Sequence, residues 1–178
     1  MAGIIKVNQY QDFNGNTLFT SDGNGNLTTQ EIMYPAFEAY LSGNQTVSDG
    51  VDTKITYNAE YYDTHNAFDS TTNYRFICPS GGAGKYYVYH QVRSFLTTSS
   101  INFTRCAIML NGTKVRDSGS NFEANPAAGV TVVCHSVITL TEGDYIEGLG
   151  QINVTSGSGY FRGDDPAYCR FGAYRIGS

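Results

Sequence analysis

The chain has 178 residues and a formal net charge of −5, with 15% charged and 13% aromatic residues. A chain of this length forms one domain, or one domain with an arm, and buries about 70% of its surface without needing a disulfide or a metal. The acidic balance and the lack of a basic stripe argue against nucleic-acid binding. No apolar run reaches the roughly 18 residues that a membrane-spanning helix needs. Low charge together with many aromatic and turn-forming residues favours β structure over helix bundles or disorder.

Residues 1–32 are predicted to form a separate arm. Turn motifs at 14–16 and 22–26 flank an apolar segment at 17–19, which predicts a small hairpin, and 4–7 predicts a short strand. The arm has too few apolar residues for its own core, so we expect it to pack on the head, on another subunit or on a larger assembly.

The arm departs from a calcium loop and from a secretory signal. Residues 22–26 resemble the start of a calcium loop, but the positions that need Gly and Glu hold Leu27 and Met33, which favours a turn. The first residues lack the apolar segment of a secretory signal, so we expect an intracellular start.

From Pro35 onward, short β-like runs alternate with turns. Strands are predicted at residues 37–41, 51–57, 74–77, 85–95, 103–110, 130–140, 145–152 and 168–176. This spacing predicts an all-β sandwich, jelly roll or barrel. Residues 30–40 also hint at a helix, which Pro35 interrupts.

The predicted strand at 85–95 is apolar or aromatic on both of its faces. Alternation separates Tyr86, Val88, His90 and Val92 from Tyr87, Tyr89 and Gln91. A strand with one solvent-exposed face is not expected to present two tyrosines to water. Either the sheet is covered on both sides, or its second face is a subunit interface.

The sequence gives no support for catalysis. Residues 81–85 depart from a phosphate loop at both ends, and the three histidines lack metal-ligand spacing. Asp63, Asp69, Asp164 and Asp165 lie in loop-like stretches, where solvated charge explains them better than an acid–base pair or a cation site. We therefore predict a non-enzymatic chain with no catalytic residue, no metal and no cofactor.

The four cysteines lie in apolar or β-like runs without a Cys-x-x-Cys pair. They are Cys78, Cys106, Cys134 and Cys169. From the residues alone, buried free thiols and a disulfide both remain open.

Residues from about 35 to 177 resemble the jelly roll shared by the complement component 1q head and tumour necrosis factor. The matching positions are Tyr57, Asp63, Phe68, Phe76, Gly84, Tyr86, Val88 and His90. The segment 171–176 is similar to the family's last strand, and 140–146 is similar to its Leu-x-x-Gly-Asp turn. Tyr57 replaces a phenylalanine, while Val88 and His90 replace aromatic residues.

This resemblance implies a homotrimeric jelly-roll β-sandwich, with residues 33–178 as the head. Carried over by position, the residues facing the three-fold axis would be Tyr87, Tyr89, Gln91, Phe171 and Ala173. The resemblance also implies that Cys106 and Cys134 correspond to a strand pair bridged in complement heads. A phage or cytosolic origin argues against that bridge forming.

The arm has a second resemblance, at residues 1–7, 11–18 and 21–26, to the leader of virion structural proteins of marine tailed phages. No collagen tract or coiled-coil heptads precede the head, which also favours the phage interpretation over a secreted ligand. The expected function is a virion structural protein assembled in the host cytoplasm. We expect a capsid decoration (cement) protein docked onto other virion proteins through residues 1–32. The alternative is a tail-tip or tail-fibre head that binds a host-surface glycan or protein through loops 63–73 and 157–165.

Overall fold

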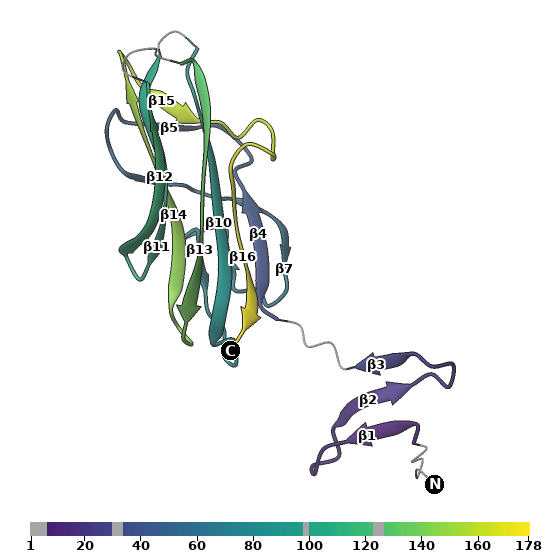
Figure 1. Ribbon diagram of the computed structural model, residues 1–178. Helices are drawn as coiled ribbons and strands as arrows, with labels where there is room; N and C mark the ends of the chain where they lie inside the picture. Colours follow the sequence, from purple (N-terminus) through teal and green to yellow (C-terminus); the bar gives the residue numbers. More distant parts are fainter. Residues whose placement is uncertain (1–6, 30–33, 98–99, 123–126) are drawn as a thin grey trace. The chain divides into compact units, whose positions relative to one another are not determined.

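The computed structural model describes residues 7–29, 34–97, 100–122 and 127–178, and every regular element in these ranges is a β-strand (Figure 1). The chain separates into two compact units, residues 1–33 and 34–178. Within the described ranges, no helix is long and apolar enough to cross a membrane.

The first unit contains a three-stranded antiparallel sheet. Its strands are β1 (Gln9–Gln11), β2 (Thr17–Ser21) and β3 (Leu27–Thr29), in that order. Strand β2 includes the predicted apolar segment 17–19, and the predicted hairpin is extended by a third strand. Residues 4–6 of the strand predicted at 4–7 lie outside the described residues.

The two turns of this sheet are built in the same way. The Asp12 carboxylate accepts hydrogen bonds from the backbone N–H groups two and four residues further on, and from the side-chain amide of Asn16. Asp22 makes the equivalent bonds in the second turn, with Asn26 in the corresponding place. These bonds hold the pKa of both carboxyl groups below their usual value. The turn interpretation of residues 22–26 is therefore confirmed.

The second unit is a sandwich of two antiparallel sheets, here called the front and back sheets. The front sheet contains β4 (Ala36–Tyr40), β5 (Gln45–Val47), β7 (Ala59–Asp63), β10 (Gly84–Phe95), β13 (Gly129–Leu140), β15 (Gly159–Phe161) and β16 (Arg170–Gly177). The back sheet contains β6 (Thr53–Lys54), β8 (Phe68–Asp69), β9 (Arg75–Ile77), β11 (Ile101–Leu110), β12 (Thr113–Asn121) and β14 (Tyr145–Val154). Strand β10 lies between the edge strand β13 and β16 in the front sheet (Figure 1).

One hydrophobic core fills the space between the sheets. Phe37 of the front sheet stacks on Phe76 and Phe68 of the back sheet, with ring centroids 4.9 and 4.8 Å apart. Phe37 and Phe76 are completely buried, and each ring contributes about 1.5–3 kcal/mol through its burial. The buried residues of both sheets belong to a single cluster, which confirms the predicted β-sandwich.

Local predictions are confirmed in most places and wrong in a few. Of the strand predicted at 51–57, only Thr53–Lys54 is a strand. The helix hinted at for residues 30–40 is wrong for its described part, because 36–40 form β4. Strand β12 has no predicted counterpart.

Candidate functional site: the aromatic face of the front sheet

The outer side of the front sheet carries a band of aromatic and aliphatic side chains, here called the aromatic face. Its members are Tyr62, Tyr87, Tyr89, Gln91, Val133, His135, Val137, Tyr174 and Ile176. On β10, the outward positions alternate strictly with buried ones. Tyr87, Tyr89 and Gln91 therefore point outward, as the sequence predicts.

Two residues predicted for this face lie elsewhere. Phe171 and Ala173 are completely buried in the core between the sheets. Residues opposite each other on antiparallel strands share a face, and Phe171 pairs with the inward His90 while Ala173 pairs with the inward Val88. Their assignment to the three-fold axis is therefore wrong. The outward positions of β16 opposite Tyr89 and Tyr87 are Gly172 and Tyr174.

Tyr89 is held across the sheet by its hydroxyl group. The O–H donates to Glu38 Oε2 at 2.7 Å, and Glu38 Oε1 also accepts from Arg170 at 3.0 Å. Burial, followed by the bond to Glu38, raises the pKa of Tyr89 well above its ordinary value. The ring crosses β16 at Gly172, where a Cβ would overlap the phenol and lie 2.9 Å from the Phe37 carbonyl oxygen. The phenol is thus a neutral, fixed part of the surface.

Tyr87 lies at the centre of a second aromatic group. Its ring centroid is 5.4 Å from that of Tyr174 and 5.8 Å from that of His135. Beside it, Val137 keeps 55% and Tyr174 keeps 43% of its surface exposed. A contiguous apolar patch of this kind on a folded protein marks an interaction surface. The chemistry of the aromatic face suits packing and hydrogen bonding to another protein surface.

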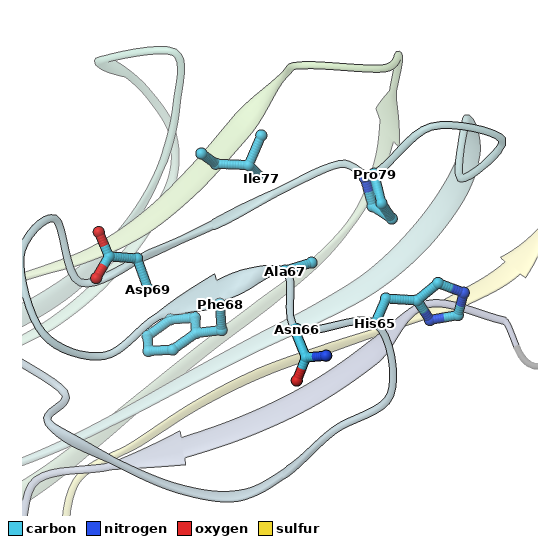
Figure 2. Close-up of a pocket in the computed structure, with 7 residues that line it drawn as sticks. All are labelled: His65, Asn66, Ala67, Phe68, Asp69, Ile77 and Pro79. Atoms are coloured by element: carbon cyan, nitrogen blue, oxygen red, sulfur yellow. The ribbon is translucent and has the colours of Figure 1, made fainter.

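A separate pocket of about 350 Å³ opens beside the loop that follows β7, and Figure 2 shows the side chains around it. Its lining residues are His65, Asn66, Ala67, Phe68, Asp69, Ile77 and Pro79. This pocket uses part of loop 63–73, one of the two loops predicted as a binding rim.

The carboxylates near this pocket shape the loop itself. Asp69 accepts hydrogen bonds from the backbone N–H groups of Thr71, Thr72 and Asn73, and these bonds lower its pKa strongly. Asp63 accepts from the backbone N–H groups of His65 and Phe68. Both carboxylates therefore order the loop.

The other two loop carboxylates are also engaged locally. Asp164 pairs with Arg162 at 2.6 Å, which lowers the pKa of its carboxyl group. Asp165 accepts a hydrogen bond from the backbone N–H of Ala167. These contacts tie down the segment that leads into β16.

A group that sequence spacing did not identify lies in the core. His90, Cys106 and Cys134 come from β10, β11 and β13, and their ligand-type atoms lie within 4.8 Å of one another. The four cysteines, all in described residues, are buried free thiols. The three groups come together only through the register of β10 with β13 and the packing of β11 against them, so a search for close sequence spacing could not find them.

Comparison with known sequences gives a partial match. No family model matches the chain. A segment of 99 residues is 32% identical to the uncharacterized protein YqcC of Bacillus subtilis, and covers 53% of this chain and 26% of that protein. The chain thus spans about a quarter of the length of this relative.

Solved structures give a broader match. The globular domain of zebrafish complement 1qA aligns with a TM-score of 0.56 and 18% identity, covering 80% of this chain and 97% of that one. Murine APRIL aligns with a TM-score of 0.57 and 12% identity over 80% and 99% of the two chains. Eiger TNF from S. frugiperda aligns with a TM-score of 0.53 and 13% identity over 81% and 92%. The second unit has the complement 1q and tumour necrosis factor-like jelly-roll fold, as predicted.

Proposed function

We propose that the head, residues 34–178, forms a homotrimer through the aromatic face. The observation that carries this proposal is the band of exposed and half-exposed apolar side chains on β10, β13 and β16. Burying it against two further copies removes Tyr174, Val133, Val137 and Ile176 from water, at about 25 cal/mol for each Å² of apolar surface. The jelly-roll fold is consistent with this assembly, and cyclic symmetry gives every copy the same contacts.

The trimer is tested by mass in solution. Sedimentation of the wild-type chain at micromolar concentration should give three times its 19.4 kDa. Tyr89→Asp and Val137→Asp each place a carboxylate in the packed face, where an unpaired buried charge costs several kcal/mol. Both variants should therefore sediment as smaller species.

A matched control comes from the other sheet. Val115 of β12 is exposed to 41%, and Val115→Asp makes the same chemical change away from the aromatic face. This variant should remain trimeric. A wild-type chain that sediments as a monomer, or a Val137→Asp variant that stays as trimeric as the Val115→Asp variant, contradicts the interface.

The trimer is proposed to serve as a non-enzymatic structural protein of a phage particle, most simply as a capsid decoration protein. The leader-like sequence of residues 1–26 supports this role, because it supplies a short segment for docking onto other virion proteins. A three-fold trimer matches the local three-fold positions of an icosahedral shell. Cryo-electron microscopy of the particle tests the location, and density for the head at the tail instead of the capsid contradicts it.

The pocket beside loop 63–73 favours one second candidate, a tail-tip or tail-fibre head that binds a host-surface glycan or protein. The pocket combines polar groups, such as Asn66, with the apolar surfaces of Ile77 and Pro79, a mixture typical of ligand sites. Purified head should then bind host cells and block infection. Without binding or blocking, this candidate fails while the capsid role stands.

A further inference from the structure

The core of the head contains a group of metal-ligating side chains that the trimer does not use. Cys106 reaches into the core from the back sheet, and His90 and Cys134 reach in from the front sheet. His90 and Cys106 have no exposed surface, and Cys134 keeps 3%. Their three ligand-type atoms lie within 4.8 Å of one another. Around a single ion, metal–sulfur and metal–nitrogen bonds are about 2.3 and 2.0 Å long. Small movements of the three side chains would bring the two sulfurs and the nitrogen to such distances from one ion.

The imidazole of His90 is already oriented as a ligand would be. Its Nε2 lies 2.7 Å from the Tyr57 hydroxyl oxygen. Its Nδ1 is buried without a hydrogen-bond partner among the described residues. A metal-bound histidine usually donates its other ring N–H to a neighbouring acceptor, which fixes the tautomer. If Nε2–H donates to Tyr57, Nδ1 keeps a free lone pair inside the core, in a place where an unpaired polar atom is costly.

The surroundings make room for this ring and hold Cys106 by one weak hydrogen bond. Gly148 of β14 faces the imidazole, and a Cβ there would lie 2.7 Å from Nε2. Cys106 Sγ makes a weak hydrogen bond, donating to the His90 carbonyl oxygen at 3.8 Å.

We propose that His90 Nδ1, Cys106 Sγ and Cys134 Sγ bind one thiophilic d¹⁰ cation, Zn²⁺ or Cu⁺, in the core of each head. Soft thiolate ligands select these ions over Mg²⁺ and Ca²⁺. Zn²⁺ with two thiolates leaves the buried site neutral, whereas three protein ligands without a fourth suit Cu⁺. Binding releases the thiol protons to solvent and stabilises the folded head, because the unfolded chain offers no preformed site. The site lies within one chain and does not depend on the proposed trimer.

The ion is tested by refolding the full chain in reducing buffer. One equivalent of Zn²⁺, or of Cu⁺ without oxygen, is added, the protein is dialysed against a competing chelator, and the retained metal is measured by elemental mass spectrometry. One ion per chain should remain after one of the two additions, and the ion that is retained is the one that the site binds. The thermal midpoint of the loaded protein should exceed that of the metal-free protein. Retention of neither ion by the wild-type chain overturns the proposal.

Variants assign the ligands. Cys106→Ala and Cys134→Ala should each lose the stoichiometric ion, while Cys169→Ala should keep it, since Cys169 is an equally buried thiol outside the group. Tyr57→Phe removes the partner of the imidazole and should weaken binding about 10–100-fold. Equal metal content in Cys134→Ala and the wild type contradicts the assignment.

A spectroscopic measurement keeps the proposal testable if the alanine variants do not fold. Wild-type chain refolded with Co²⁺ should show thiolate-to-metal charge-transfer absorption in the near ultraviolet. Absence of that band in a chain that also retains no Cu⁺, or recovery of a metal-free chain in which Cys106 and Cys134 have become a disulfide under the same reducing conditions, overturns the site.

Discussion

Gly172 shows how a single missing side chain shapes the candidate interface. A Cβ at this position would overlap the Tyr89 phenol and lie 2.9 Å from the Phe37 carbonyl oxygen. Gly172→Ala should therefore displace Tyr89 from Glu38 and destabilise the head by about 1–3 kcal/mol, the usual cost of overpacking. Urea unfolding measures the change. Gly177→Ala is the matched control, since a Cβ there meets nothing within 4 Å. Equal stability of the two variants would show that Tyr89 moves aside freely.

The contribution of Asp69 to the stability of the head should depend on pH. Its carboxylate accepts three backbone N–H bonds, which lower its pKa from the ordinary value of 3.8. A lowered pKa in the folded state contributes stability above pH 3.8, and this contribution is lost as the pH falls toward the folded pKa. Asp69→Asn should thus lower the thermal midpoint at pH 7, and the gap from the wild type should narrow below about pH 4.

The control for Asp69 separates loop order from total charge. Glu60 is an exposed carboxylate on β7, and Glu60→Gln removes the same charge without touching the loop. Its thermal midpoint should follow that of the wild type at both pH values. A gap between Asp69→Asn and the wild type that stays constant from pH 7 to pH 3 would contradict the role of the charged carboxylate.

At the scale of elements, a buried hydrogen bond between two hydroxyl groups links β10 to β11 across the sandwich. Ser94 Oγ lies 2.6 Å from Thr104 Oγ1, and both residues are completely buried. The Thr104 hydroxyl also donates to the Gln151 carbonyl oxygen of β14, so Ser94 acts as the donor to Thr104. Thr104→Val leaves the Ser94 hydroxyl unsatisfied and should cost about 1–3 kcal/mol.

A double-mutant cycle tests this link between the sheets. Ser94→Ala combined with Thr104→Val removes both partners, so it should cost less than the sum of the two single changes in urea unfolding. Strictly additive costs would show that the two hydroxyl groups act independently.

The strands also show which structural features the sequence predicts and which it does not. The two faces of β10 are predicted correctly, because its buried and outward residues alternate without a break. Strand β12 has no counterpart among the predicted strands. Its side chains are mostly exposed, and it is held by pairing with β11 rather than by an apolar face. Phe171 and Ala173 were misplaced because a shift of one residue exchanges the two faces of a strand.

At the scale of the whole molecule, the spacing of strands and turns predicts an all-β sandwich, jelly roll or barrel, and the resemblance of residues 35–177 to the complement 1q and tumour necrosis factor family narrows this to the jelly roll. The metal-ligating group could not be predicted, because His90, Cys106 and Cys134 meet only through pairing across β10 and β13 and packing between the sheets. The role of residues 1–32 in docking stays a prediction. The distribution of buried side chains over the described residues does, however, predict whether the stability of each unit depends on the other.

All members of the hydrophobic core cluster lie in the head, from Phe37 onward, whereas none of residues 7–26 is buried. A small sheet whose described side chains are not buried has little stability of its own. The head alone, residues 34–178, should therefore unfold at the same temperature as the full chain, and a peptide of residues 1–33 should show little β structure by circular dichroism. A lower midpoint for the head, with the oligomeric state unchanged, would mean that the arm contributes to its stability. A folded peptide would mean that the turns at Asp12 and Asp22 suffice to hold the small sheet.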